Sequence, residues 1–131
     1  MKLVDLNCHL VMLRDLQTAQ ARLRRLYEKA FPGAQNLDGM PHGSGVHDKV
    51  GELAVEIADY ETAVKALEKK VKASEEAAES FISTIDNRDI RLYLRLHFLR
   101  DMLWKEVADT CDTTEAAVKS AVYGWFRENN F

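Results

Sequence analysis

The residues with the clearest chemical potential lie near the C-terminus, at spacings that place them on one helical face. Lys119, Tyr123 and Arg127 follow one another at intervals of four, which is the spacing of neighbours on a helix surface. Lysine, arginine and tyrosine commonly donate to phosphate oxygens. One turn earlier, Glu115 and Ala116 carry groups that can contact a cytosine amine and a thymine methyl group, respectively. The pattern predicts a surface that contacts double-stranded DNA, and a solvated helix face is the alternative.

The segment before this surface predicts the first half of a helix-turn-helix. Val107 and Cys111 lie four residues apart and share a helical face. The small Ala108 beside them leaves room for a second helix to approach closely. The helix is then interrupted by residues that favour caps and turns, namely Asp112, Thr113 and Thr114.

A second helix is expected over about 114–128. Either Asp112 or Thr114 can cap its start, and Asp112 with Glu115 has the reciprocal capping-box spacing. Glu115 therefore suits a capping role as well as a base contact. The buried face is expected to contain Val118, Ala121, Val122 and Trp125. The threonines of the turn are placed to donate to phosphate at a helix N-terminus. The candidate DNA-contacting residues are Thr113, Thr114, Glu115, Ala116, Lys119, Ser120, Tyr123 and Arg127.

These residues resemble the promoter-reading end of sigma-70-type factors, called region 4. The resemblance rests on three short runs, Glu106-Val107-Ala108, Thr114-Glu115 and Val118-Lys119-Ser120. Upstream, the run from Met40 to Val50 (MPHGSGVHDKV) is similar to the joint of a group of small phage proteins, the ArpU-like late-transcription regulators and their prophage relatives. The resemblance implies a phage or prophage transcription regulator whose last helix lies in the major groove. It also implies DNA and RNA polymerase as candidate partners.

The turn differs from that of the family at two positions. Where the family usually has glycine, this chain has Asp112, and where it usually has an aliphatic residue, this chain has Thr113. The resemblance therefore implies a left-handed backbone at Asp112, which aspartate tolerates with some strain. Thr113 gives the turn less apolar surface to pack.

The charge of the chain does not match that of a simple DNA-binding repressor. The net charge is −3. Residues 1–45 contain six basic and four acidic residues, residues 46–87 contain five and ten, and residues 88–131 contain seven of each. Because phosphate contacts supply most non-specific DNA affinity, the neutral last segment should bind DNA weakly alone. It needs dimerisation, a partner such as RNA polymerase, or basic residues gathered on one face. A helical protein-interaction module without direct DNA binding is the alternative function.

Two long helices are expected before the helix-turn-helix. Residues 3–31 keep apolar residues at three- and four-residue spacing and end before Pro32. A loop over 32–45 follows. Residues 46–85 then carry a coiled-coil seam formed by Val46, Val50, Leu53, Ile57, Tyr60, Val64, Leu67, Val71, Ser74, Ala78, Phe81 and Ile85. Ser74 and Ala78 form a narrow waist where another helix can approach closely.

The expected fold is therefore all-α. A long antiparallel helical hairpin, coiled-coil-like, occupies 1–85, and a three-helix helix-turn-helix bundle occupies 86–131. The seam needs a partner, and the first helix and a second copy of the chain are both candidates, so we expect a hairpin that also forms a homodimer.

The first helix of the bundle is apolar almost all round and is expected to be central. Asp86 or Asn87 should cap it. Arg88, Arg91 and Arg95 form one basic edge, suited to a DNA backbone, to an acidic polymerase surface or to solvent. Trp104 and Trp125 are expected in the core. The two functional hypotheses differ in whether Arg88, Arg91, Lys105, Lys119 and Arg127 converge on one surface.

The sequence contains no pattern typical of catalysis, a cofactor or a metal. It has no glycine-rich phosphate loop, nucleophile elbow or paired-carboxylate context, and the spacings of its four histidines and two cysteines match no zinc motif. Two cysteines are too few for a disulfide framework and fit a reducing compartment. Neither a signal-peptide pattern nor about 20 consecutive apolar residues is found. We therefore expect a cytoplasmic, non-enzymatic protein without cofactors.

Overall fold

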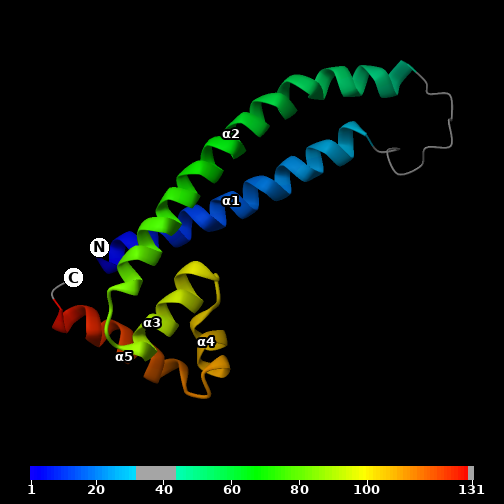
Figure 1. Cartoon of the computed structure of the whole chain (residues 1–131). Coiled ribbons are helices and arrows are strands. Elements are labelled where there is room, and N and C mark those ends of the chain that lie inside the picture. Colours follow the sequence, from blue (N-terminus) through cyan, green and yellow to red (C-terminus); the bar gives the residue numbers. More distant parts are fainter. Residues whose placement is uncertain (32–43, 130–131) are drawn as a thin grey trace. The chain divides into compact units, whose positions relative to one another are not determined.

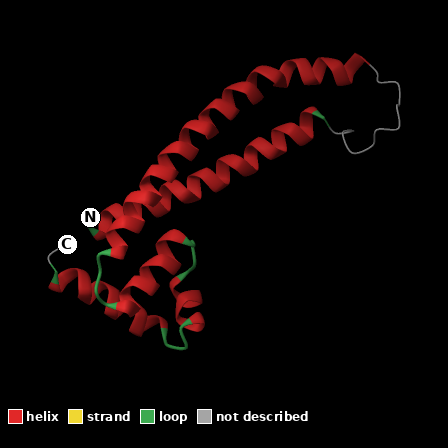
Figure 2. Cartoon of the chain, viewed as in Figure 1, coloured by secondary structure: helices red, strands yellow, loops and turns green. Residues whose placement is uncertain are grey.

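The computed structural model describes residues 1–31 and 44–129, with side chains for residues 1–31 and 51–129. Over these residues the chain consists of helices and short connections, without strands (Figure 1, Figure 2). The helices are α1 (Leu3–Ala30), α2 (Ser44–Ser83), α3 (Arg88–Leu94), the π-helical turn η1 (Arg95–Leu99), α4 (Trp104–Thr110) and α5 (Glu115–Glu128). The predicted all-α fold is confirmed, while most of the predicted loop 32–45 lies outside the described residues. None of the described helices is long and apolar enough to cross a membrane.

The chain divides into two compact units. The C-terminal unit contains residues 1–13 and 71–131, and the hairpin unit contains residues 14–70. These units differ from the expected division into 1–85 and 86–131. The physical reason is that the start of α1 and the end of α2 share one apolar cluster with the helices that follow them.

The core of the C-terminal unit is built from every helix in it except α4. Its buried members are Leu6, Leu10, Ala78, Ile82, Ile85, Ile90, Leu94, Phe98, Val122 and Phe126. Fully burying a side chain the size of leucine or phenylalanine stabilises a fold by roughly 1.5–3 kcal/mol relative to leaving it exposed. The bundle therefore depends on the ends of the two long helices for much of its apolar packing.

Small side chains on α2 allow α1 to approach closely within the C-terminal unit. Ala78 is completely buried, and Ser74 Oγ lies 2.8 Å from Nδ1 of His9 on α1. The predicted narrow waist at Ser74 and Ala78 is thus observed, and α1 is the helix that occupies it.

The hairpin unit contains the second half of α1 and most of α2, which run antiparallel within it (Figure 1). Ile57 and Val64 of the predicted seam are buried, and the seam residues Leu53, Tyr60 and Leu67 are half-buried. Gln20 of α1 donates a hydrogen bond to Glu68 of α2 over 3.3 Å. Within the described side chains of this unit, the seam of α2 is therefore its buried side, as expected for a helical hairpin.

The bundle begins at a well-defined cap. The side-chain oxygen of Asn87 accepts hydrogen bonds from the backbone N–H groups of Asp89 and Ile90, so Asn87 is the predicted cap that is used. The helix widens into a π-helical turn, η1, before the chain leaves it. Asp101 follows with a positive φ of 55°, and this conformation redirects the chain into α4.

Candidate nucleic-acid interface

Helices α4 and α5 and the turn between them form the predicted helix-turn-helix. Asp112 has a φ of 55°, so the left-handed backbone that the family resemblance implied is present. Thr113 donates its backbone N–H to the carbonyl of Ala108 over 3.0 Å, which closes the end of α4. The turn is thereby held by backbone hydrogen bonds as well as by packing.

Thr114 is the N-cap of α5. Its hydroxyl oxygen accepts a hydrogen bond from the backbone N–H of Ala117 over 3.2 Å. Of the two predicted caps, Thr114 is therefore used instead of Asp112. A hydroxyl group that accepts one hydrogen bond still has its own proton to donate, so this cap remains able to bind a phosphate oxygen.

The inner face of α5 packs on α4 and on the core. Val118 lies in one cluster with Val107 and Ala108 of α4, while Val122 and Phe126 belong to the larger core. The predicted inner face is wrong at one position, because Ala121 is exposed. Phe126 was missed, although it continues the row of Val118 and Val122 at intervals of four, and this row could have indicated it.

The outward face of α5 and the turn before it contain the eight predicted DNA-contacting residues. Thr114, Glu115, Ala116, Ser120, Tyr123 and Arg127 are exposed, and Thr113 and Lys119 are half-buried. Four of the eight continue one row at intervals of four, namely Glu115, Lys119, Tyr123 and Arg127. The structure therefore brings the predicted residues together on one side of the helix-turn-helix.

Lysine and glutamate are already paired within this face. Lys119 Nζ lies 3.0 Å from the carboxylate of Glu115, and both side chains are more than two-fifths exposed. An exposed i,i+4 pair of this kind contributes only about 0.3–0.5 kcal/mol. Lys119 can therefore leave Glu115 for a phosphate with only a small loss of free energy.

Tyr123 rests on an aromatic stack that the sequence did not indicate. Its ring meets Trp104 edge-on, with centroids 6.3 Å apart. Trp104 in turn stacks on His97, with centroids 3.8 Å apart and an interplanar angle of 15°. The Nδ1 atom of His97 lies 2.6 Å from the carbonyl oxygen of Met102, which fixes the imidazole. Tyr123 thus has a rigid support on one side while two-fifths of its surface is exposed.

Most of the predicted basic edge, Arg88, Arg91 and Arg95, forms hydrogen bonds within the protein. Arg91 donates to the carbonyl oxygens of Ile85 and Asp86 over 2.6 and 3.1 Å. Arg95 donates to both carboxylate oxygens of Glu79, the closest contact being 2.8 Å. Two of its three arginines therefore stabilise the junction between α2 and the bundle, and only Arg88 is well exposed.

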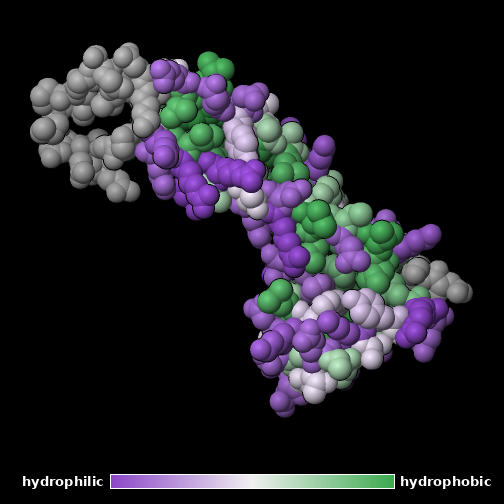
Figure 3. All heavy atoms as spheres, turned by 180° about the vertical axis from the view of Figure 1, so that it is seen from behind, coloured by the Kyte–Doolittle hydropathy of each residue, from purple (hydrophilic) through white to green (hydrophobic). Residues whose placement is uncertain are grey.

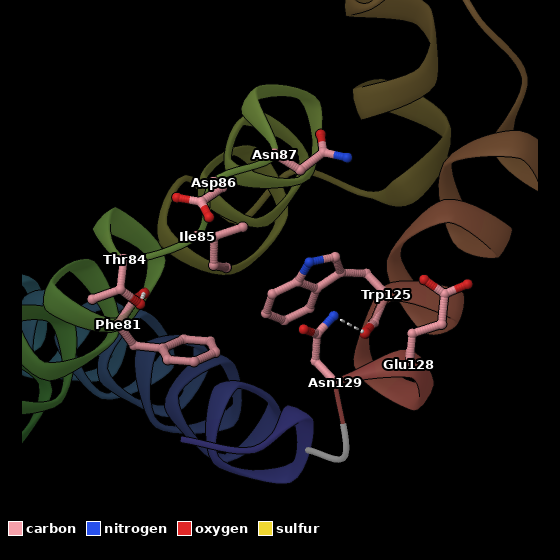
Figure 4. A pocket seen from close by; sticks show the side chains of 8 residues that line it. All are labelled: Phe81, Thr84, Ile85, Asp86, Asn87, Trp125, Glu128 and Asn129. Atoms are coloured by element: carbon pink, nitrogen blue, oxygen red, sulfur yellow. Dashed lines mark hydrogen bonds between the residues drawn. The ribbon is translucent and has the colours of Figure 1, made fainter.

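The C-terminal end of α5 has a different character. A pocket of about 440 Å³ lies there against the end of α2, and the rings of Phe81 and Trp125 line it (Figure 4). Asp86 and Glu128 also line it, and among the described residues no basic side chain does. Two carboxylates disfavour a phosphate, so the side of α5 that lines this pocket is a poor candidate for DNA contact.

The described residues contain no group of three His, Cys, Asp or Glu side chains that could hold a metal ion. His42 and His47 fall outside the residues whose side chains are described. Cys8 and Cys111 are free thiols, and burial raises the pKa of Cys111.

Comparisons of the chain with protein families, with curated proteins and with solved structures give no match. The resemblance to sigma-70-type factors and to the ArpU-like group therefore stays a prediction from the quoted motifs.

Proposed function

We propose that the chain is a sequence-specific DNA-binding transcription regulator in which α5 lies in the major groove. The observation that carries this proposal is the single exposed row on α5 from Glu115 to Arg127. A packed inner face holds that row over α4. In a helix-turn-helix the second helix enters the major groove and its N-terminal residues reach base edges.

Each part of the face has a role in this proposal. Thr113 and Thr114, at the start of α5, donate to phosphate oxygens, since a helix N-terminus favours anions. Glu115 and Ala116 reach base edges, where glutamate accepts from cytosine N4 and alanine contacts a thymine methyl group. The remaining residues follow the groove and its phosphates further along α5, namely Lys119, Ser120, Tyr123 and Arg127.

The phage or prophage setting, the contact with RNA polymerase and the homodimer are parts of the same proposal. They rest on the motif resemblance and on the seam of α2. Residues 88–131 carry no net charge, so a second copy or a polymerase would supply binding energy that the helix-turn-helix alone lacks.

One observation favours the alternative of a protein-interaction module. Arg91, Arg95 and Lys119 all have partners within the chain, which leaves the helix-turn-helix with few cations for phosphate. In this alternative the face of α5 contacts a protein, and a pull-down with RNA polymerase would identify that partner.

The decisive experiment is selection of duplexes from a random DNA library by the full chain, followed by fluorescence anisotropy on the selected duplex. We expect an enriched motif, and we expect Lys119→Ala and Tyr123→Ala each to weaken binding about fivefold or more, in line with the usual energies of groove contacts. The control is Lys65→Ala, which removes an exposed lysine from α2. Circular dichroism should show unchanged helicity in all variants. If no motif is enriched and both α5 variants bind as the wild type does, the proposal is wrong.

A further inference from the structure

A basic groove lies on the hairpin unit, outside the helix-turn-helix. Arg22, Arg25, Leu26 and Lys29 of α1 line it together with Tyr60 of α2, and its volume is about 350 Å³. Figure 3 shows apolar side chains between hydrophilic ones on one side of this unit. The groove thus combines three positive charges with an apolar floor.

Within the described part of the chain, the cations of the groove, Arg22, Arg25 and Lys29, have no ion-pair partner. All three are exposed. In the C-terminal unit, by contrast, Arg91, Arg95 and Lys119 are engaged by carbonyl or carboxylate oxygens. Three neighbouring cations of α1 are therefore available to an external anion.

The spacing of these cations suits a repeating anion. Arg22 and Lys29 are seven residues apart, which corresponds to about 10 Å along a helix axis. Successive phosphates of one DNA strand advance by about 3.4 Å along the duplex axis while they wind around it, so the three cations match the scale of a short run of phosphates. Tyr60 adds an aromatic ring to the apolar floor of the groove.

We propose that this groove binds the phosphate backbone of double-stranded DNA, as a contact additional to that of α5. The inference rests on the proposed function and deepens it, because it names the source of the phosphate-binding charge that residues 88–131 lack. DNA is favoured over an acidic protein because the proposed function already brings a duplex to this chain, while residues 88–131 carry no net charge of their own to hold its phosphates. The contact is independent of base sequence, since only phosphates and sugars would meet the groove.

The test compares two triple variants of the full chain. Arg22→Gln, Arg25→Gln and Lys29→Gln together remove three charges from the groove. Lys65→Gln, Lys69→Gln and Lys70→Gln remove three exposed charges from α2 in the same unit, so both proteins have the same net charge.

Anisotropy on a mixed-sequence duplex from roughly 50 to 200 mM salt gives the slope of log K against log salt. We expect the slope of the groove variant to be shallower by about 2–3 and its affinity about tenfold lower or more, because each lost phosphate contact reduces the slope by about 0.9. The control should change the slope by less than about one.

The outcomes separate this inference from the proposed function. If the groove variant keeps the wild-type slope, the inference is overturned, while motif selection by α5 is unaffected. If the groove variant loses the slope but Lys119→Ala and Tyr123→Ala change nothing, the groove is supported and the role of α5 fails. A groove variant that binds DNA normally but no longer binds poly-glutamate would overturn the inference in favour of an acidic protein partner.

Discussion

The Nδ1 atom of His9 lies 2.8 Å from the hydroxyl oxygen of Ser74, and this contact joins α1 to α2 inside the C-terminal unit. His9 is buried, and its Nε2 atom has no hydrogen-bond partner among the described residues. The tautomer with its proton on Nδ1 donates to Ser74 and leaves no unsatisfied N–H at Nε2. Its free energy in the folded protein is therefore lower than that of the other neutral tautomer. The charged imidazolium would need a partner at both nitrogens.

We therefore expect the stability of the protein to depend on pH through His9. Burial lowers the pKa of His9 below the ordinary value of 6.5, and the charge of Glu75 opposes this effect only in part. Between the lowered folded pKa and 6.5 the unfolded chain binds more protons than the folded chain. The free energy of unfolding is thus highest above pH 6.5 and falls as the pH drops below it, by about 1.4 kcal/mol for each unit by which the pKa is lowered. Urea unfolding between pH 5 and 8 measures this dependence.

The control for this prediction is His9→Gln. Glutamine has an amide that can bond to Ser74 but does not titrate, so its unfolding free energy should fall less between pH 6.5 and 5. Parallel pH profiles for wild type and variant would show that His9 is not the group responsible.

A second prediction concerns the pair that joins η1 to α2. Arg95 donates to both carboxylate oxygens of Glu79, and hydrogen bonding to Arg95 is the main reason that the pKa of Glu79 is lowered. Both side chains are more than a third exposed, so solvent screening reduces the value of the pair. A double-mutant cycle of Glu79→Gln and Arg95→Gln should give a coupling energy of about 0.5–1 kcal/mol at pH 7.

This coupling should disappear in acid. Because the folded pKa of Glu79 is lowered, its contribution is fully present above the ordinary value of 4.5 and is lost as the pH falls through the folded pKa. Glu76→Gln, at an exposed position on the same helix, is the matched control and should leave stability unchanged. A coupling energy of zero at pH 7 would mean that the pair does not stabilise the fold.

A third prediction follows from the positive φ of Asp112. Alanine has no side-chain group that compensates for a left-handed backbone, so Asp112→Ala should lower the free energy of unfolding by about 1 kcal/mol. Asp112→Gly should be at least as stable as the wild type, because glycine adopts this conformation without strain. Urea unfolding compares them, with Asp109→Ala as a control at an exposed position of α4. Equal stability of the alanine and glycine variants would contradict the prediction.

Periodicity in the sequence was enough to predict the helices and their buried sides. Ile57, Val64 and Val71 are buried as the seam requires, because a helix that repeats apolar residues every three to four positions has one apolar face that packs away from water. The outward face of α5 follows from the same argument. Spacing does not distinguish neighbours that are nearly equivalent on a helix, so Ala121 was expected inside and Phe126 was not.

Long-range contacts could not be predicted in this way. Arg91 and Arg95 look like a solvated basic edge when only their own helix is considered. Their partners are the carbonyl of Ile85 and the carboxylate of Glu79, and the turn at Asn87 decides that these groups meet. The π-helical turn η1 could not be predicted either. Arg95–Leu99 belongs to a segment that is apolar almost all round, so the pattern of its residues does not show where the helix widens.

The last prediction tests the close approach of α4 and α5 at Ala108. Only 2% of this residue is exposed, and it is packed in one cluster with Val107 and Val118. Ala108→Leu adds three carbon atoms where no space exists, and overpacking of this kind typically costs about 1–3 kcal/mol. We expect lower thermal stability and a change in the fluorescence of the neighbouring Trp104. We also expect the proposed DNA binding to be lost, because α5 would no longer be held in place on α4. Ala121→Leu makes the same substitution on the exposed side of α5 and should leave the unfolding temperature unchanged. If the two leucine variants were equally stable, α4 and α5 would not pack against each other at Ala108. The contact that holds the outward row of α5 in place would then be absent.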